Sequence, residues 1–490
     1  MSLKNDAIRG VFWSSVEKFS IITVQFFLQI VLARLLTPKD YGIVGILAVF
    51  LAIATTFIDC GFTKALIQNQ QRTEKDYSTA FYFNLAISLA CYIILFILAP
   101  YIADFYNLPI LKPVTRILTL TLPISAISAV NRTKLQIKVD FKTQSKITVS
   151  SYILSGIIGV ILAYNGFGVW ALVTQTVLGS IFNTILLFWF VKWFPKENFS
   201  IESFKKMYNF GIKLLGASLI DNLYYNLYPL IIGKFFSPVD LGFFSKGKGF
   251  AYIPNTIING ILNRVTFPIF SRVQNDLKKL FYMYRKYLRL MSSVYVPIIL
   301  VMCAVAKPLI AFLLGEKWLG CVPIMQIFCI SFSFDCMINV NLNFLYVKGY
   351  TNIVLKLAII KKIIAFIILI TFFKFGGTVI WLCWGQVLHT QIAVFLNTYY
   401  TKKKLGLGYF MQMKDILPIF FVAVISAVIA YGITFIDISN IMQLITAVPL
   451  AVIIYLLLAY ILKFEIIDEV KNLLYKLKNK YFPITKAEEN

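Results

Sequence analysis

The chain has 490 residues, of which 59% are hydrophobic and only 14% are charged, and its mean hydropathy is +0.78. Soluble domains are closer to a quarter charged, so this composition excludes a soluble enzyme, a secreted disulfide scaffold and a disordered protein. Lipid must therefore be the solvent for most of the chain. The formal net charge of +25 raises nucleic-acid binding as an alternative, which the positions of the cations decide.

Apolar stretches long enough to cross a bilayer core of about 30 Å recur along the whole sequence. Open-edged sheets cannot cross lipid, so each stretch is predicted to be a helix. The fourteen predicted spans are residues 10–35, 41–61, 77–103, 114–130, 147–164, 168–191, 207–235, 240–263, 290–314, 320–346, 352–373, 376–399, 415–435 and 440–462. The first is interpreted as a membrane span and not as a removable signal peptide, because no small-residue cleavage site accompanies it.

The cations indicate the topology of the chain. If the N-terminus is cytoplasmic, the inward segments carry 36 of the 47 lysines and arginines and the outward loops carry 8. Only Lys18, Lys246 and Lys248 fall inside spans. This asymmetry is the positive-inside pattern, which predicts that both termini are cytoplasmic. The positive charge then implies affinity for anionic lipids, and no nucleic-acid partner is needed to explain it.

Cysteine and histidine usage gives no sign of a metal, a cofactor or a catalytic triad. The seven cysteines contain no CxxC pair and lie mostly in apolar runs, so we expect them to be buried packing residues. His389 is the only histidine, which leaves almost nothing to build a zinc site or a Ser-His-Asp triad.

An internal repeat divides the chain. Leu36–Gly42 and Phe236–Gly242 match at an offset of 200 residues, and the match continues without gaps through the following helix. Each repeat contains six spans, so both copies have the same orientation in the membrane and are expected to form two lobes around a central cavity. The predicted fold is an all-α polytopic membrane protein with an N-lobe (1–200), a C-lobe (201–400), two extra helices (401–463) and a basic cytoplasmic tail (464–490).

Ionisable residues inside spans mark candidate functional positions, because a charge in hydrocarbon is costly and usually faces a cavity or a partner. On the eighth span, Lys248, Tyr252, Asn255 and Asn259 follow helical spacing and form one polar stripe. Lys246 lies about 160° away on an apolar face, where we expect it to extend to the outer interface.

Polar stripes also occur on other spans. They comprise Lys18 and Gln25 on the first span, and Asp221, Tyr224, Tyr225 and Tyr228 on the seventh. Asp335 begins a third stripe on the tenth span. Glu17, Asp221 and Asp335 are candidates for coupling transport to an ion gradient. Alternatives stay open: Glu17 and Lys18 could pair with neighbouring helices, and the tyrosines could serve helix packing.

Several segments together resemble Wzx-type polysaccharide flippases of the colanic-acid exporter type, which are lipopolysaccharide biosynthesis proteins. The matching segments include Leu32–Leu36, Asp40–Gly42, Asp59–Gly61, Gly166–Val173, Leu241–Lys246 and Phe267–Arg272. The resemblance covers residues 8–275 and implies the multidrug/oligosaccharidyl-lipid/polysaccharide exporter superfamily. That superfamily has twelve core helices in two lobes and often two extra ones.

The resemblance also implies a function, which is not enzymatic. Such proteins move undecaprenyl-diphosphate-linked oligosaccharides (O-antigen, capsule or exopolysaccharide repeat units) across a bacterial inner membrane, with a polysaccharide polymerase and other assembly proteins as expected partners. The family pattern has a basic residue at the position of Lys246, whereas helical spacing favours Lys248, and we keep both as candidates for binding the diphosphate together with Lys18.

Two other classes of function are compatible with the sequence. A polytopic polysaccharide polymerase or ligase would be expected to carry a long outward loop, and the outward loops here are short. A cation-coupled drug exporter or a lipid II flippase would share the fold and differ in cargo. Drug exporters of cations would be expected to line the cavity with acids more than with lysines.

Overall fold

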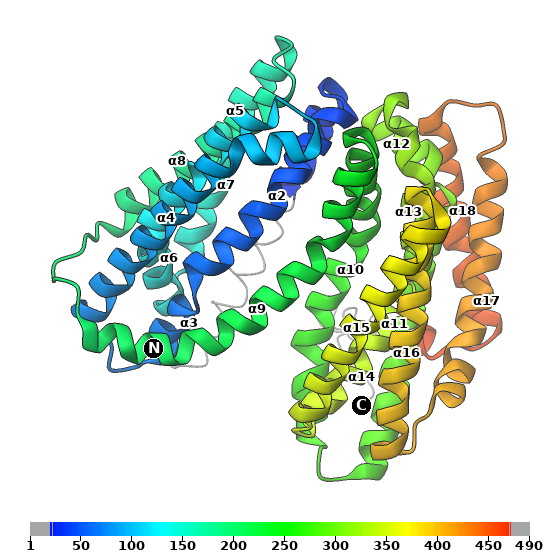
Figure 1. Cartoon of the computed structure of the whole chain (residues 1–490). Helices are drawn as coiled ribbons and strands as arrows, with labels where there is room; N and C mark the ends of the chain where they lie inside the picture. Colours follow the sequence, from blue (N-terminus) through cyan, green and yellow to red (C-terminus); the bar gives the residue numbers. More distant parts are fainter. Residues whose placement is uncertain (1–19, 22, 470, 472–490) are drawn as a thin grey trace, which may run out of the picture. The chain divides into compact units, whose positions relative to one another are not determined.

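A computed structural model describes residues 20–21, 23–469 and 471, with all their side chains except those of residues 210, 213, 214, 217 and 257–269. This part of the chain is helical and contains no strand, which confirms the predicted all-α class (Figure 1). The helices are α2 (Pro38–Asp59), α3 (Phe62–Gln68), α4 (Glu74–Tyr106), α5 (Leu111–Leu118), α6 (Thr121–Ile137), α7 (Phe141–Tyr164), α8 (Val169–Val191), α9 (Ile201–Phe235), α10 (Pro238–Arg272), α11 (Leu277–Ala304), α12 (Ala306–Leu314), η1 (Glu316–Cys321), α13 (Val322–Phe332), α14 (Asp335–Val347), α15 (Thr351–Gly376), α16 (Val379–Leu405), α17 (Tyr409–Ile433) and α18 (Asn440–Ile461).

Ten helical segments among the described residues are long and apolar enough to cross a membrane, and a shorter apolar helix covers Thr23–Leu35. The chain is thus a multi-pass membrane protein. Helix α15 falls outside this set because it carries four lysines. The predicted count of fourteen spans remains a prediction. Of the seven cysteines, five are buried and two are half-buried, in agreement with a packing role.

The chain divides into two compact units, Met1–Ser245 and Lys246–Asn490. The predicted N-lobe, residues 1–200, lies within the first unit. Helix α9 and the start of α10 belong to that unit as well, because α9 packs against α2, α3 and α4. The remaining predicted boundaries, and the repeat itself, stay predictions.

The two Pro-x-Asp-x-Gly segments that the sequence pairs at an offset of 200 residues begin α2 and α10. Ahead of α2, the Thr37 hydroxyl donates to Asp40 Oδ2 (2.6 Å) and accepts from the Asp40 N–H (3.3 Å). Ahead of α10, the Ser237 hydroxyl donates to Asp240 Oδ2 (2.7 Å) and accepts from the Asp240 N–H (3.1 Å). Each segment is therefore a capping box that satisfies backbone groups at the start of its helix.

The first turns of α2 and α10 pack against each other, and the glycine of each turn contacts the backbone of the other helix. A Cβ atom on Gly42 would lie 1.7 Å from the Pro238 carbonyl oxygen, and one on Gly242 would lie 2.0 Å from the Pro38 carbonyl oxygen. All four residues belong to the first unit. The contact is reciprocal, and its closeness explains why each segment has a glycine two positions after its aspartate.

In the first unit, the lysine of an ion pair lies against two aromatic rings. Lys134 Nζ lies 3.1 Å from Glu74 Oε1 and within 4.5 Å of the ring centroids of Tyr77 and Trp193. Trp193 Nε1 donates to Glu74 Oε2 at 2.8 Å. The cluster joins α4, α6 and the segment after α8. The rings cover the Lys134 side chain, which is 15% exposed, whereas the Glu74 side chain is 45% exposed.

In the second unit, charged side chains attach α17 and the segment after α18 to α11. Arg285 donates two hydrogen bonds to Asp415, at 2.7 and 2.5 Å. Arg289 donates to Asp415 at 3.2 Å and to Glu465 at 2.6 Å. The Asp415 side chain is only 5% exposed, so it depends on these partners to compensate for its lost hydration.

Replacing either glycine of the reciprocal contact by alanine should destabilise the protein. For Gly42→Ala or Gly242→Ala, the methyl group meets backbone, so the helices must separate at a cost of roughly 1–3 kcal/mol. The thermal midpoint of the detergent-purified protein measures this. Gly216→Ala and Gly249→Ala are matched controls, because an added Cβ meets nothing within 4 Å there. An unchanged midpoint in both test variants would contradict the close packing.

The ion pairs of α11 should differ in their contribution to stability according to burial. Asp415→Asn removes the charge that two arginines share and should lower the free energy of unfolding by about 1–3 kcal/mol. Glu469→Gln breaks the salt bridge between Lys286 and Glu469, whose side chains are 34% and 46% exposed. This substitution should lower the free energy of unfolding by at most about 1 kcal/mol. Thermal midpoints of the two variants compare them; equal losses would contradict this account.

Candidate functional site

The polar stripe predicted on the eighth span packs against α13 and α14 within the second unit. Lys248 Nζ lies 5.8 Å from the ring centroid of Phe328. One turn further along, the Tyr252 ring lies 5.5 Å from the ring of Phe332, and the Asn255 side-chain amide donates to Asp335 on the following turn.

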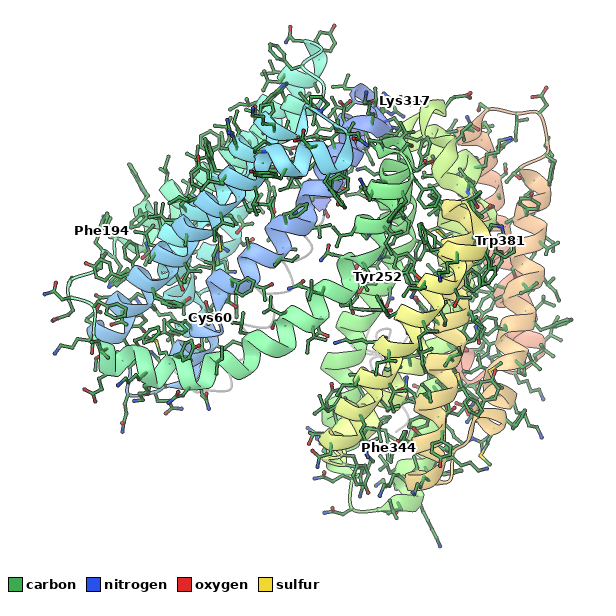
Figure 2. The ribbon with its side chains drawn as sticks, in the orientation of Figure 1. Cys60, Phe194, Tyr252, Lys317, Phe344 and Trp381 are labelled. Atoms are coloured by element: carbon green, nitrogen blue, oxygen red, sulfur yellow. The ribbon has the colours of Figure 1, made fainter. Side chains whose placement is uncertain are left out.

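These three contacts occur in the same order on both sides. The stripe positions 248, 252 and 255 meet positions 328, 332 and 335, with identical i, i+4, i+7 spacing, so the two helical segments run side by side in the same direction. The structure thereby joins two stripes that the sequence placed on separate helices. Figure 2 labels the Tyr252 side chain on α10. Tyr252 is 45% exposed, whereas Asn255 is 3% exposed.

Lys246 does not extend to the surface as the sequence analysis expects. Its side chain is 7% exposed, and it is buried in the second unit. The neighbouring Gly247 shows why: a Cβ on that residue would lie 2.8 Å from the Cys321 carbonyl oxygen and 3.0 Å from Ile324, so this turn of α10 packs tightly on η1 and α13. Lys246 is therefore an enclosed cation, whereas Lys248 is half-buried on a different face of the same helix.

The tyrosines of α9 have different environments in the first unit. Tyr225 is 65% exposed and its ring lies 5.7 Å from that of the half-buried Tyr224. Tyr228 is 6% exposed and stacks on Phe244 at 6.0 Å, with 4° between the ring planes. Tyr228 thus has a packing role, one of the two alternatives left open by the sequence. Asp221 is exposed.

For the other predicted site residues, the structure gives few or no side-chain contacts. Gln25 is half-buried on the Thr23–Leu35 helix. Glu17 and Lys18 lie outside the described residues, and the side chain of Asn259 lies outside them as well. The expected ligand role of these residues remains a prediction.

Sequence reasoning missed amide contacts in both units. On α9, Asn222 donates to the Thr56 hydroxyl at 2.5 Å, and Asn226 donates to the Asn222 carbonyl at 2.8 Å. Their i, i+4 spacing beside the tyrosines was the available signal. In the second unit, Asn341 donates to Gln412 Oε1 at 2.9 Å and accepts from Thr401 at 2.6 Å. Gln412 was not predicted as part of a polar cluster, because it lies in a segment interpreted as a loop.

The second unit therefore offers one enclosed and one half-buried lysine, a partly exposed phenol, and an amide on α10 that donates to a carboxylate on α14. Ammonium groups bind phosphate oxygens, and aromatic rings with amides bind sugars or rings of similar shape. Among the described residues, no group of three or more His, Cys, Asp or Glu side chains could hold a metal ion. The arrangement is suited to binding an anionic ligand.

Two curated proteins are similar to most of this chain. The lipopolysaccharide biosynthesis protein WzxC of Escherichia coli (strain K12) is 25% identical over 423 residues, covering 85% of this chain and 83% of that protein. The teichuronic acid biosynthesis protein TuaB of Bacillus subtilis (strain 168) is 27% identical over 363 residues, covering 72% and 73%.

The fold has a counterpart among solved structures. The lipid II flippase MurJ, in an inward closed conformation, is similar with a TM-score of 0.74 at 14% identity, and the alignment covers 93% of this chain and 100% of MurJ. Similarity at this identity shows a shared fold. The family model described as Polysaccharide biosynthesis protein matches residues 31–323, more than half of the sequence. The chain therefore belongs to the Polysaccharide biosynthesis protein family.

Proposed function

We propose that this protein is a flippase that moves a lipid-diphosphate-linked oligosaccharide across a bacterial inner membrane. The cargo is an undecaprenyl-diphosphate-linked repeat unit of O-antigen, capsule or exopolysaccharide. Family membership and the names of WzxC and TuaB support a role in polysaccharide assembly. The MurJ-like fold supports a transporter and not an enzyme.

One observation carries the proposal to particular residues. The stripe of Lys248, Tyr252 and Asn255 places a cation, an aromatic ring and an amide on successive turns of α10, in the order that a diphosphate followed by sugars would need. Lys246 and Lys248 supply positive charge for the diphosphate, while Tyr252 remains exposed enough to stack on a sugar ring. Lys18, Gln25, Asn259, Tyr224 and Tyr225 extend the proposed binding surface.

Alternating access is the proposed mechanism. Two six-helix lobes would rock around a central cavity, with the polar head inside and the lipid tail in the bilayer. Asp335 is the preferred coupling residue of the three candidates, because its carboxylate accepts a hydrogen bond from Asn255 in the stripe. Binding of a proton or sodium ion at Asp335 would weaken or redirect that bond and so change the stripe that holds the cargo.

The proposed setting follows from charge and cargo. The basic loops and both termini face the cytoplasm, where anionic lipids attract them. A polysaccharide polymerase and other assembly proteins would receive the flipped unit on the opposite side.

The alternatives differ in one measurable property each. A polymerase or ligase would lengthen or transfer the glycan, a drug exporter would move organic cations, and a lipid II flippase would move a peptide-bearing precursor.

Transport should be observable in liposomes that contain the purified protein and a fluorescent lipid-diphosphate oligosaccharide. An impermeant quencher distinguishes the outer from the inner leaflet. Lys248→Gln should slow the transfer roughly tenfold, because a charge-assisted contact to phosphate contributes about 1.5–3 kcal/mol. Lys374→Gln, at the exposed end of α15, is the matched loss of one charge and should leave the rate unchanged.

The same assay separates the competing functions. Transfer without any change in glycan length supports a flippase. Chain lengthening would point to a polymerase, and preferential transfer of lipid II or of a cationic dye would assign a different cargo. An unchanged rate in Lys248→Gln would remove this residue from the site while leaving the flippase proposal intact.

Asp335→Asn should abolish the response of transport to an imposed proton or sodium gradient. The substitution preserves the size of the side chain and its ability to bond with Asn255, so the fold is retained. The ratio of transfer rates with and without a gradient is the measurement, and it should fall to about one. Asp221→Asn and Glu17→Gln test the other two candidates. A gradient response that persists in Asp335→Asn and disappears in one of these would transfer the coupling role.

A further inference from the structure

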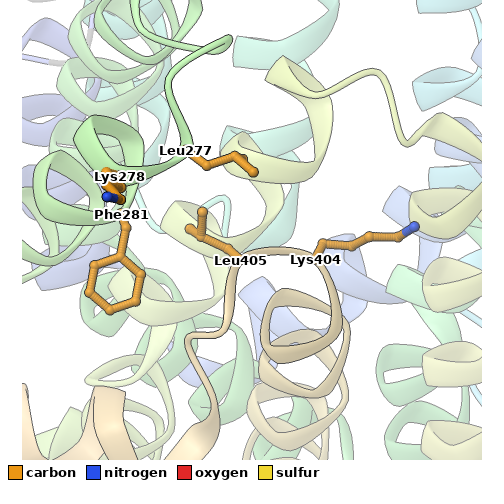
Figure 3. A pocket seen from close by; sticks show the side chains of 5 residues that line it. All are labelled: Leu277, Lys278, Phe281, Lys404 and Leu405. Atoms are coloured by element: carbon orange, nitrogen blue, oxygen red, sulfur yellow. The ribbon is translucent and has the colours of Figure 1, made fainter.

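A small pocket lies in the second unit, where the first turn of α11 meets the last turn of α16. Its volume is about 350 Å³, and it is lined by Leu277, Lys278, Phe281, Lys404 and Leu405 (Figure 3). This size is within the range of small-ligand sites in proteins. None of the five residues belongs to the stripe of α10, so the pocket is separate from the proposed transport site.

The pocket combines an apolar centre with a cation on each side. Leu277 and Leu405 face each other across it, and the Phe281 ring forms a further wall (Figure 3). The Lys278 side chain lies beside Phe281. The exposed Lys404 side chain extends away from the other four lining residues, with its Nζ 4.7 Å from the ring centroid of Tyr350. Leu277 is 52% exposed, so its apolar surface is available to a ligand.

Charge in the two segments that form the pocket is strongly one-sided. Residues 276–281 and 402–405 carry five lysines and a single acidic residue, Asp276. The Asp276 carboxylate accepts the Lys279 backbone N–H at 3.0 Å as the N-cap of α11. The nearby Asp415 is paired with Arg285 and Arg289. The ligand that complements this surface is therefore anionic, with an apolar portion next to the charge.

Geometry restricts the ligand further. The pocket lies at the ends of two membrane-crossing helices, α11 and α16, which is where lipid headgroups meet protein. We propose that it binds the headgroup of an anionic phospholipid of the cytoplasmic leaflet. The phosphate binds Lys278 and Lys404, whose exposed side chain turns from Tyr350 toward the ligand, and the glycerol and first acyl carbons pack against Leu277, Phe281 and Leu405. The choice of leaflet rests on the orientation given under the proposed function; the binding itself does not.

A lipid bound in this pocket would contact the part of α11 that the ion pairs attach to α17. The Arg285 guanidinium lies 5.9 Å from the ring centroid of Phe281, so one wall of the pocket contacts the network that attaches α17 to α11. Occupancy of the pocket should therefore also raise the thermal midpoint of the protein, because a ligand that binds only the folded state stabilises it.

The test is a titration of the detergent-purified full chain with phosphatidylglycerol or phosphatidylcholine, followed by native mass spectrometry. The double variant Lys278→Gln/Lys404→Gln should weaken phosphatidylglycerol binding roughly tenfold to thirtyfold, since each lysine near a lipid phosphate contributes severalfold. Lys205→Gln/Lys206→Gln on α9 removes the same charge from two exposed lysines and should change affinity less than about twofold. Leu405→Trp should fill the pocket and weaken binding without changing the charge.

Four results would overturn the proposal. These are equal losses in the two double variants, equal binding of phosphatidylcholine and phosphatidylglycerol, equal binding of inorganic phosphate and the lipid, and displacement of phosphatidylglycerol by the lipid-diphosphate oligosaccharide. The last would assign the pocket to the transported substrate. The titration does not depend on transport. If the flippase proposal is wrong and the lipid site is real, the liposomes will show no transfer while the protein still binds phosphatidylglycerol selectively.

Discussion

The free-energy cost of leaving a polar group unsatisfied in hydrocarbon governs this structure. It forces the apolar stretches into helices, whose backbone groups bond within each segment. It also acts on hydroxyl side chains inside the helices: Ser151 donates to the Ile147 carbonyl at 2.7 Å, and Ser155 donates to the Ser151 carbonyl at 2.8 Å. Serine and threonine are tolerated in these spans because the turn before them offers an acceptor.

Charged side chains meet the same constraint in two ways. Near the start of α17, Asp415 is compensated by two arginines, and the carboxylate becomes a joint between helices. Along α10, charges and amides are enclosed by α13 and α14, where a ring lies beside Lys248 and an amide donates to Asp335. The first arrangement is a structural clamp. The second keeps polar groups in a span where a purely structural helix would use leucine, which is the pattern expected of a functional helix.

The position of Asp335 connects the proposed binding and coupling steps. A carboxylate that bonds directly to the stripe can alter the stripe when its charge is neutralised, without any relay through distant residues. This direct contact is the reason for preferring Asp335 in the proposed mechanism.

The sequence alone determined the membrane class and the helical fold, because these depend on composition and on the length of apolar stretches. The predicted helix ends were less accurate: the span predicted to begin at residue 290 belongs to α11, which begins at Leu277. The local sequence also contains the Thr37 and Ser237 capping boxes, which begin α2 and α10. It was also sufficient to place Lys248, Tyr252 and Asn255 on one face. Helical period could not reveal which helix that face meets, that Lys246 is enclosed, or that Gln412 joins a buried amide cluster. Those facts depend on packing between residues 70 or more positions apart, which only the tertiary structure decides.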